Sequence, residues 1–204
     1  MGRGGGPDGL LCLTGRYGMF ASPMAGERIT TSGTEEDLQR MVSLPGDTLK
    51  QLLATMIRNL WRVDGLYFLG IEKRFGTEAA TEIDAQCWAS MAELEARDLM
   101  RIFSIEAGSL DALEKTLPLT TWVLDHTHKR MTRTADALVF EVLECRTQKT
   151  RLKKSLPVFP CRYVREGYLT RFAAVFGCRC DCEVCPPGDR DGEVWCRWRF
   201  TQMT

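Results

Sequence analysis

The feature that most constrains this chain is a concentration of cysteines near its C-terminus. Five of the nine cysteines fall within nineteen residues, namely Cys178, Cys180, Cys182, Cys185 and Cys196. The two-residue gap between Cys182 and Cys185 lets two thiolates face one metal ion across a tight turn. Pro186-Pro187-Gly188 follows and favours such a turn. The cluster therefore predicts a metal site built on a turn.

Two further cysteines complete a set of four sulfur ligands. Cys196 lies on the strand expected after the turn, and Cys161 lies at the start of the helix expected before it. Four sulfurs form the closed tetrahedral set of a structural zinc site. Zinc would also protect thiolates on an exposed turn from oxidation. We therefore expect one zinc ion, held by Cys161, Cys182, Cys185 and Cys196.

Three other interpretations of the cysteines stay open. An iron–sulfur cluster also takes four cysteines, and Cys182 with Cys185 could act as a redox dithiol. Simple burial of unliganded thiols is the third, and it is what we expect for Cys87 and Cys145. Cys178 and Cys180 share a strand face with Cys182, so either could replace one of the four ligands.

Composition indicates a soluble globular protein. The chain has 204 residues, of which 44% are hydrophobic and 26% are charged, and this size suits one domain. It contains no apolar run of about 18 residues and no secretory signal pattern. We therefore expect a cytoplasmic protein with no membrane partner, in which cysteines serve as thiols or metal ligands.

The formal net charge is zero, so no overall field favours nucleic acid. Between positions 146 and 171, however, eight basic residues accompany the single acid Glu166. This basic run is interpreted either as a solvated strand edge or as a docking face for an anionic ligand, a nucleic acid or a protein.

The first forty residues differ from the rest of the chain. They are rich in glycine and have no sustained helical or strand period, so they bury too little apolar surface to offset the entropy of ordering. We expect residues 1–40 to be a flexible extension, Met41 to begin the functional protein, and residues 41–204 to form a single α+β domain.

The periodicity after Met41 predicts helices first and strands afterwards. Helices are expected over 47–75, from 77 onward, over 109–118 and over 161–176, and strands over 126–133, 137–145, 178–183 and 193–201. On the second helix, Ile83, Cys87, Met91 and Leu94 share one expected apolar side. This order predicts an α+β fold in which a helical layer packs on an antiparallel β-sheet.

Several residues on the apolar helix faces are candidates for a ligand chamber. Acidic side chains there need a partner, because burial of an unpaired carboxylate is costly; Asp64 and Glu72 could form ordinary ion pairs with Arg62, Lys73 or Arg74. Alternatively, acids and aromatics together line a chamber, the candidates being Trp61, Asp64, Phe68, Glu72, Asp84, Trp88, Tyr168 and Phe172.

His126 and His128 are the only histidines, and they are expected on one strand face. With Asp125 they could bind a metal or a substrate, or form a solvated pair. No Ser/His/Asp order, phosphate loop or nucleotide fingerprint occurs.

The C-terminal half resembles the 4-vinyl-reductase-type small-molecule-binding domains, which include sensor domains of phenol-responsive bacterial activators. The matching residues are Cys161, Gly167, Tyr168, Phe172, Cys182, Cys185 and Cys196. The resemblance implies zinc at the four cysteines, an apolar chamber beside it, and often a homodimer. Cys182 departs from the sensor domains, which have a carboxylate at that position.

The N-terminal half resembles a family of bacterial and archaeal proteins known only as cytosolic proteins. The similarity covers Trp61, Asp64, Gly65, Phe68, Glu72, Gly76, Ala80, Asp84 and Trp88. The aminothiazoline-carboxylate hydrolase group is a further relative by architecture, without a catalytic motif that matches residue by residue.

These observations predict a module that binds a small apolar or aromatic molecule between helices and sheet and is stabilised by structural zinc. The alternatives are a hydrolase that uses Asp64, Glu72, Asp84 or His126, and a protein-interaction module that uses the basic run. The residues leave open whether chemistry follows binding.

Overall fold

The computed structural model describes residues 33–188 and 190–203. The chain divides into two compact units, Met1–Leu44 and Pro45–Thr204. In the first unit, helix α1 spans Thr34–Val42 and has three acids in its first turn, where they complement the positive end of the helix dipole. It is helical where the periodicity predicted no regular element. Residues 1–32 of the expected extension lie outside the residues that the structure describes.

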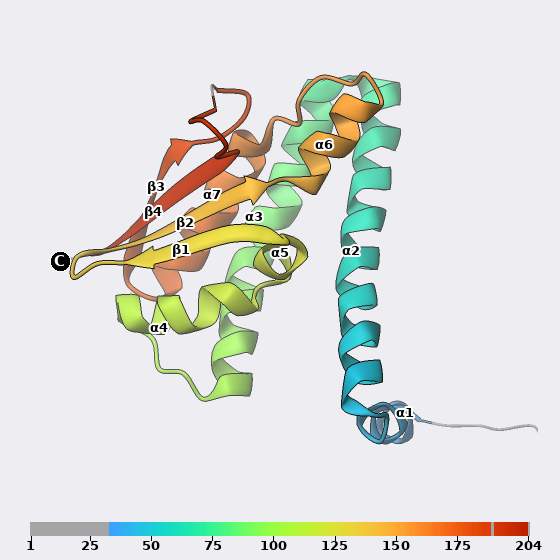
Figure 1. The fold of residues 1–204 in the computed structure, drawn as a ribbon, viewed down its shortest axis with the longest axis vertical. Helices are drawn as coiled ribbons and strands as arrows, with labels where there is room; N and C mark the ends of the chain where they lie inside the picture. Colours follow the sequence, from blue (N-terminus) through green and yellow to red (C-terminus); the bar gives the residue numbers. More distant parts are fainter. Residues whose placement is uncertain (1–32, 189, 204) are drawn as a thin grey trace, which may run out of the picture. The chain divides into compact units, whose positions relative to one another are not determined.

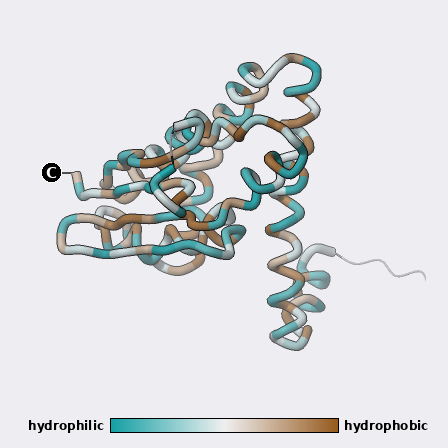
Figure 2. The backbone as a smooth tube through the Cα atoms, turned by 45° about the horizontal axis from the view of Figure 1, so that its top comes forward, coloured by the Kyte–Doolittle hydropathy of each residue, from teal (hydrophilic) through white to brown (hydrophobic). Residues whose placement is uncertain are grey.

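The second unit begins with two long helices, α2 (Gly46–Phe75) and α3 (Thr77–Phe103), joined at Gly76 (Figure 1). Gly76 has φ of 90°, a conformation that side-chain-bearing residues rarely adopt. The predicted helices and their junction at Gly76 are confirmed. Along α2, hydrophobic and hydrophilic residues alternate in short runs (Figure 2), as expected for an amphipathic helix.

The buried face of α3 is not the one predicted. Ile83, Met91 and Leu94 are 44–58% exposed, and Cys87 is also exposed. The buried face instead carries Ala80, Asp84, Trp88, Ala92 and Ala96. Helix α7 (Cys161–Val175) packs there, and a Cβ added to its Gly167 would lie 3.8 Å from the Ala89 Cβ. Small residues allow this close approach, whereas larger apolar side chains would separate the helices.

A short helical segment connects α3 to the sheet. Helix α4 spans Leu110–Thr116, and its predicted start is confirmed because the Ser109 side chain accepts a hydrogen bond from the Ala112 backbone. A 3₁₀ turn follows at Leu117–Leu119. Helix α5 (Thr121–Asp125) was not predicted; the Thr120 hydroxyl caps it by accepting a hydrogen bond from the Val123 backbone.

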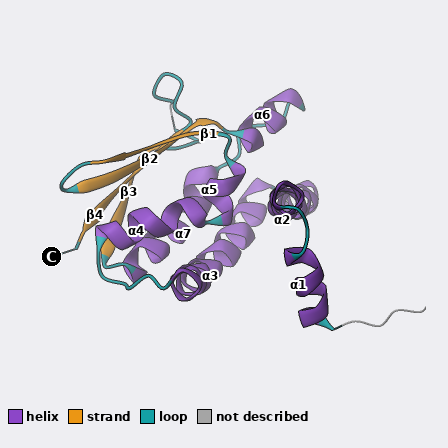
Figure 3. Ribbon diagram, turned by 60° about the horizontal axis from the view of Figure 1, so that its bottom comes forward, coloured by secondary structure: helices purple, strands orange, loops and turns teal. Residues whose placement is uncertain are grey.

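Four antiparallel strands form the sheet: β1 (His128–Arg133), β2 (Ala137–Glu144), β3 (Cys178–Val184) and β4 (Cys196–Gln202). Their order is β1-β2-β4-β3. Helices α4 and α7 lie against one face of the sheet, with α3 beyond α7 (Figure 3). The predicted α+β architecture is confirmed.

One helix after the sheet's first hairpin was missed. Helix α6 spans Arg146–Lys153, within the basic run interpreted as a strand edge, so that interpretation is wrong. Among the described residues, no helix combines the length and apolar character needed to cross a membrane.

We expect Ala92→Leu to lower the free energy of unfolding by about 1–3 kcal/mol, because the larger side chain must displace α7. Ala92 is fully buried. Denaturant-induced unfolding measures the change. The neighbouring exposed position provides the control, since Met91→Leu should leave stability within about 0.5 kcal/mol. Equal stability of both variants would show that α3 and α7 are not closely packed.

Candidate functional site

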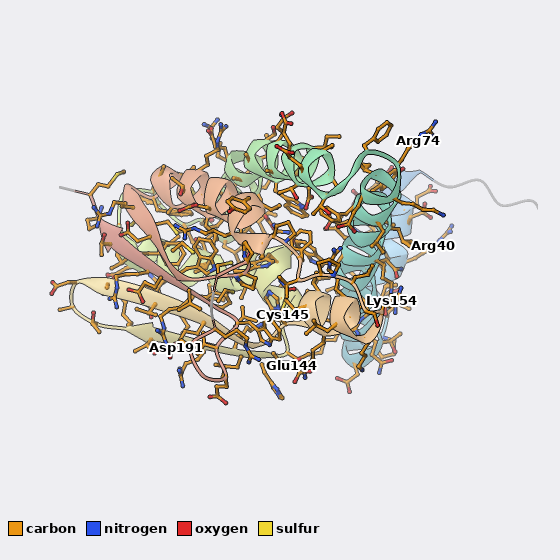
Figure 4. The ribbon with its side chains drawn as sticks, turned by 90° about the horizontal axis from the view of Figure 1, so that it is seen from above. Arg40, Arg74, Glu144, Cys145, Lys154 and Asp191 are labelled. Atoms are coloured by element: carbon orange, nitrogen blue, oxygen red, sulfur yellow. The ribbon has the colours of Figure 1, made fainter. Side chains whose placement is uncertain are left out.

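A cavity of about 420 Å³ opens between α2, α5, α6, the start of α7 and the start of β4. Cys145 and Lys154, which immediately flank α6, both line it (Figure 4). An ion pair from Arg151 on α6 to Glu72 on α2, with N–O distances of 2.8 and 3.0 Å, holds two of these elements together. The cavity therefore has walls contributed by segments far apart in the sequence.

Aromatic side chains form much of its wall, including Trp61, Phe68, Trp122 and Phe159. The rings of Phe68 and Phe159 meet edge to face with centroids 4.8 Å apart. Phe159 is fixed by the buried Gln148 amide, which accepts a hydrogen bond from its backbone N–H and donates one to its carbonyl. The Trp61 indole donates to the Thr121 carbonyl at 3.1 Å, which attaches α2 to α5.

The structure places three of the eight predicted ligand-binding residues, Trp61, Asp64 and Phe68, on the cavity wall. Trp88 lies behind the wall: its ring stacks on Trp61 at 4.6 Å and its indole donates to Asp64 at 3.0 Å.

The other four are elsewhere. Glu72 pairs with Arg151 and not with any of the three partners considered from the sequence. Tyr168 donates a hydrogen bond to Glu95 at 2.6 Å, and Phe172 is fully buried in the core. Asp84 is buried on α3, behind the wall. The predicted set thus divides into wall and supporting residues.

Asp64 and Asp84 form a hydrogen-bonded pair of carboxyl groups. Burial and then the negative charge of Asp64 raise the pKa of Asp84 to about 7, whereas the nearby Arg165 opposes that shift. Burial also raises the pKa of Asp64. No N–H or hydroxyl group of the described residues donates to Asp84 Oδ2. The pair therefore retains a proton at pH values where an isolated aspartate has lost it.

Arg165 was missed as a site residue. It lies on the cavity wall and is only 3% exposed. Its guanidinium carbon is 4.4 Å from the Trp88 ring centroid and 4.7 Å from that of Trp61, close enough for cation–π attraction. The available signal was its spacing from Tyr168, Leu169 and Phe172, which puts it on the buried face of α7.

His126 is also on the cavity wall, and the expected strand pairing of the two histidines is wrong. His126 follows α5, is 8% exposed and has no hydrogen-bond partner among the described residues for either ring nitrogen. Burial, followed by the charges of Arg165, Lys129 and Arg146, lowers its pKa to about 3. His128 instead begins β1, is exposed, and lies 2.9 Å from Glu144.

Ion pairs within the described part of the chain involve half of the eight basic residues of the run, Arg162 with Glu166 among them. Arg146 bonds Asp125 at 2.8 Å, Lys149 bonds Glu144 at 2.7 Å, and Arg151 bonds Glu72. These contacts direct the charges inward or along the surface, which weakens the case for a docking face there.

The fold brings the four predicted cysteines together. The Cys185 thiol is hydrogen-bonded with those of Cys161, Cys182 and Cys196, and these bonds raise its pKa far above the ordinary value. The same bonds lower the pKa values of Cys161 and Cys182.

The backbone fixes this arrangement. The Arg162 N–H donates to the Pro186 carbonyl at 2.8 Å, which joins the start of α7 to the cysteine turn. Pairing of Val142 with Cys196 sets the position of the last cysteine. Cys161 and Cys196 also line the cavity, so the sulfur cluster and the cavity adjoin.

Among the described residues, however, no group of three or more His, Cys, Asp or Glu side chains is arranged as a set of metal ligands. The eight cysteines described are free thiols. Cys178 contacts the Phe176 carbonyl at 3.5 Å instead of the cluster. Cys145 is buried as predicted, whereas the prediction for Cys87 is wrong.

Residues 42–202 match the model of a family of unknown function (DUF6125). The chain belongs to this family. The matched region includes every element that lines the cavity and all four clustered cysteines. No curated protein is similar in sequence.

Asp84→Asn should make the protein progressively more stable, relative to the wild type, between pH 4 and 7. In that window the folded wild type retains a proton that the unfolded chain releases, so its stability falls as the pH rises. The difference should reach on the order of 2 kcal/mol. Urea unfolding across the pH range measures it, with the exposed Asp98→Asn on the same helix as control. Parallel stability curves for wild type and variant would contradict the raised pKa.

Proposed function

We propose that this protein is a cytoplasmic small-molecule-binding module whose cavity holds a small apolar or aromatic molecule, and that one structural zinc ion stabilises it. The observation that carries the proposal is the aromatic-walled cavity directly beside the four-cysteine cluster. The resemblance to 4-vinyl-reductase-type domains implies the same combination.

The cavity supports a binding role by its size and lining. Its volume of about 420 Å³ lies within the range of roughly 300–1,000 Å³ of ligand pockets in proteins. Its wall combines aromatic rings with polar groups, among them the half-buried Asp64 and the buried His126 and Arg165. Such a lining provides affinity through the rings and orientation through the polar groups.

The donor set supports zinc. Cys161, Cys182, Cys185 and Cys196 are hydrogen-bonded through Cys185, and the lowered pKa values of Cys161 and Cys182 favour the thiolate form that binds metal. Four sulfurs leave no coordination position for water, so the zinc would be structural. It would join the start of α7, the turn and β4.

A hydrolase related to the aminothiazoline-carboxylate group is the second candidate. The favouring observation is Asp64, which lies on the cavity wall beside the buried Asp84 and has a raised pKa. A carboxyl group of this kind suits general acid–base chemistry. In such an enzyme Asp64 would transfer the proton, and Asp84 would hold the Asp64 carboxyl group in place.

We expect Cys185→Ser to release zinc and lower the thermal midpoint, because metal binding and folding are coupled in such sites. Elemental analysis of protein purified without chelator should give one zinc per chain for the wild type and much less for the variant. The exposed Cys87→Ser provides a matched control that keeps the metal. Iron with visible absorbance, or no metal in the wild type, would contradict the zinc site. Native mass spectrometry of the same samples reports whether the chain is the homodimer that the resemblance implies.

Toluene should quench tryptophan fluorescence and raise the thermal midpoint of the wild type by mass action. Trp61→Ala should weaken its binding about tenfold, because a large aromatic contact is lost, without loss of zinc. Tyr67→Ala, which changes an exposed ring on the same helix, is the control and should have no effect. Absence of toluene binding to the wild type would contradict an apolar ligand.

Asp64→Asn separates the two candidates in the same samples. A binding module should retain toluene affinity within a few-fold. A hydrolase should turn over an aminothiazoline carboxylate and lose that turnover by about two orders of magnitude or more in the variant.

A further inference from the structure

Arg165 is a buried cation without an ionic partner in the part of the chain that the structure describes. No other described side chain or backbone group forms a hydrogen bond or ion pair with it, and its Nη1 is enclosed without a partner. Burial of a charge is costly unless opposite charge or hydrogen bonds compensate it. The rings of Trp61, Trp88, Trp122 and Tyr168, whose centroids are 4.4–5.9 Å away, provide part of that compensation.

The two nearest acids do not complete it. Asp64 accepts a hydrogen bond from Trp88 and is hydrogen-bonded with Asp84. Neither forms an ion pair with Arg165 in the described part of the chain, although its positive charge acts to lower the pKa of both. Arg165 thus retains hydrogen-bonding capacity on the cavity wall.

The cavity lining as a whole has an excess of positive charge. Its basic residues are Arg58, Arg62, Arg146, Arg151, Lys154 and Arg165, against the acids Asp64 and Asp125. Arg146 is paired with Asp125, and Arg151 with Glu72. Arg58 and Lys154 form no ion pair among the described residues. The cavity therefore favours an anion over a cation or a neutral molecule.

Geometry favours a planar anion. The guanidinium group is planar and offers parallel N–H donors that match a carboxylate. The surrounding rings limit the orientations it can take, so little entropy is lost when a ligand binds. Trp61, Phe68 and Phe159 provide apolar wall for the remainder of the molecule.

We propose that Arg165 binds the carboxylate of a small organic acid whose apolar body lies against the aromatic wall of the cavity. This inference rests on the proposed binding function and names its ligand class. His126, which shares the Trp122 ring as a neighbour with Arg165, lies beside the bound carboxylate.

The test compares benzoate with benzamide, its neutral analogue of nearly equal shape, on the metal-loaded full chain. Calorimetry at neutral pH should give at least tenfold tighter binding of benzoate. Hexanoate and hexanamide should show the same preference if an aliphatic body also fits. Equal affinity for acid and amide in both pairs would overturn the proposal.

Histidine-selective NMR then locates the site, since the chain has only two histidines. Benzoate should shift the His126 signals and leave those of the exposed His128 in place. Saturation without a change at His126 would place the anion elsewhere and overturn the proposal.

Arg165→Gln should weaken benzoate binding at least tenfold and leave benzamide binding unchanged. Arg171→Gln, at an exposed position of the same helix, is the control that should alter neither. An equal loss of both ligands in Arg165→Gln would mean that Arg165 only shapes the cavity, which overturns the proposal. If Arg165→Gln does not fold, the acid–amide comparison in the wild type decides.

Toluene separates this inference from the proposed function. Binding of toluene without benzoate would overturn the carboxylate site and leave the binding function intact. Failure of both ligands would remove both proposals.

Discussion

The burial of helix α7 on two sides is the constraint on which the site depends. One side packs on α3 across small residues such as Ala92, and the other packs on β3. Tyr168 at its centre donates to Glu95, whose other oxygen accepts hydrogen bonds from Thr121 at the start of α5. One helix therefore fixes a cysteine at its first residue, an arginine one turn later and core aromatics beyond. Displacement of α7 would disturb the sulfur cluster and the cavity together.

Local signals account for the parts of the fold that the sequence predicted well. Gly76 and Gly177, both with positive φ, ended helices where expected, because glycine adopts that conformation without steric cost. The prediction of the buried face of α3 was wrong for a different reason. Hydrophobic periodicity ranks Ile83 and Met91 above Ala92, whereas close helix packing selects small side chains. Short helices such as α5 and α6 carry too few residues for any period to show.

The cavity could be predicted only in part, because its polar contacts join distant segments. Trp61, Asp64 and Phe68 follow a single helical stripe, so the sequence identified them. Glu72 and Arg151 are 79 residues apart, and nothing local indicates that they pair. Arg165 was interpreted as one member of a basic run, since its aromatic surroundings come from three other segments of the chain. The grouping of the cysteines was easier to predict from the sequence, because ligand spacing near a turn is a local property.

The proposed metal and ligand sites share α7, and this sharing has a thermodynamic consequence. Cys161 and Arg165 are one helical turn apart and both line the cavity, so they project from the same side of the helix. An ion that fixes Cys161 against the cysteine turn also restricts where the guanidinium can lie. Metal loading would therefore raise ligand affinity by reducing the motion that binding must arrest. By linkage, the bound ligand would raise metal affinity by the same factor. A structural ion in this position would thus influence recognition without touching the ligand.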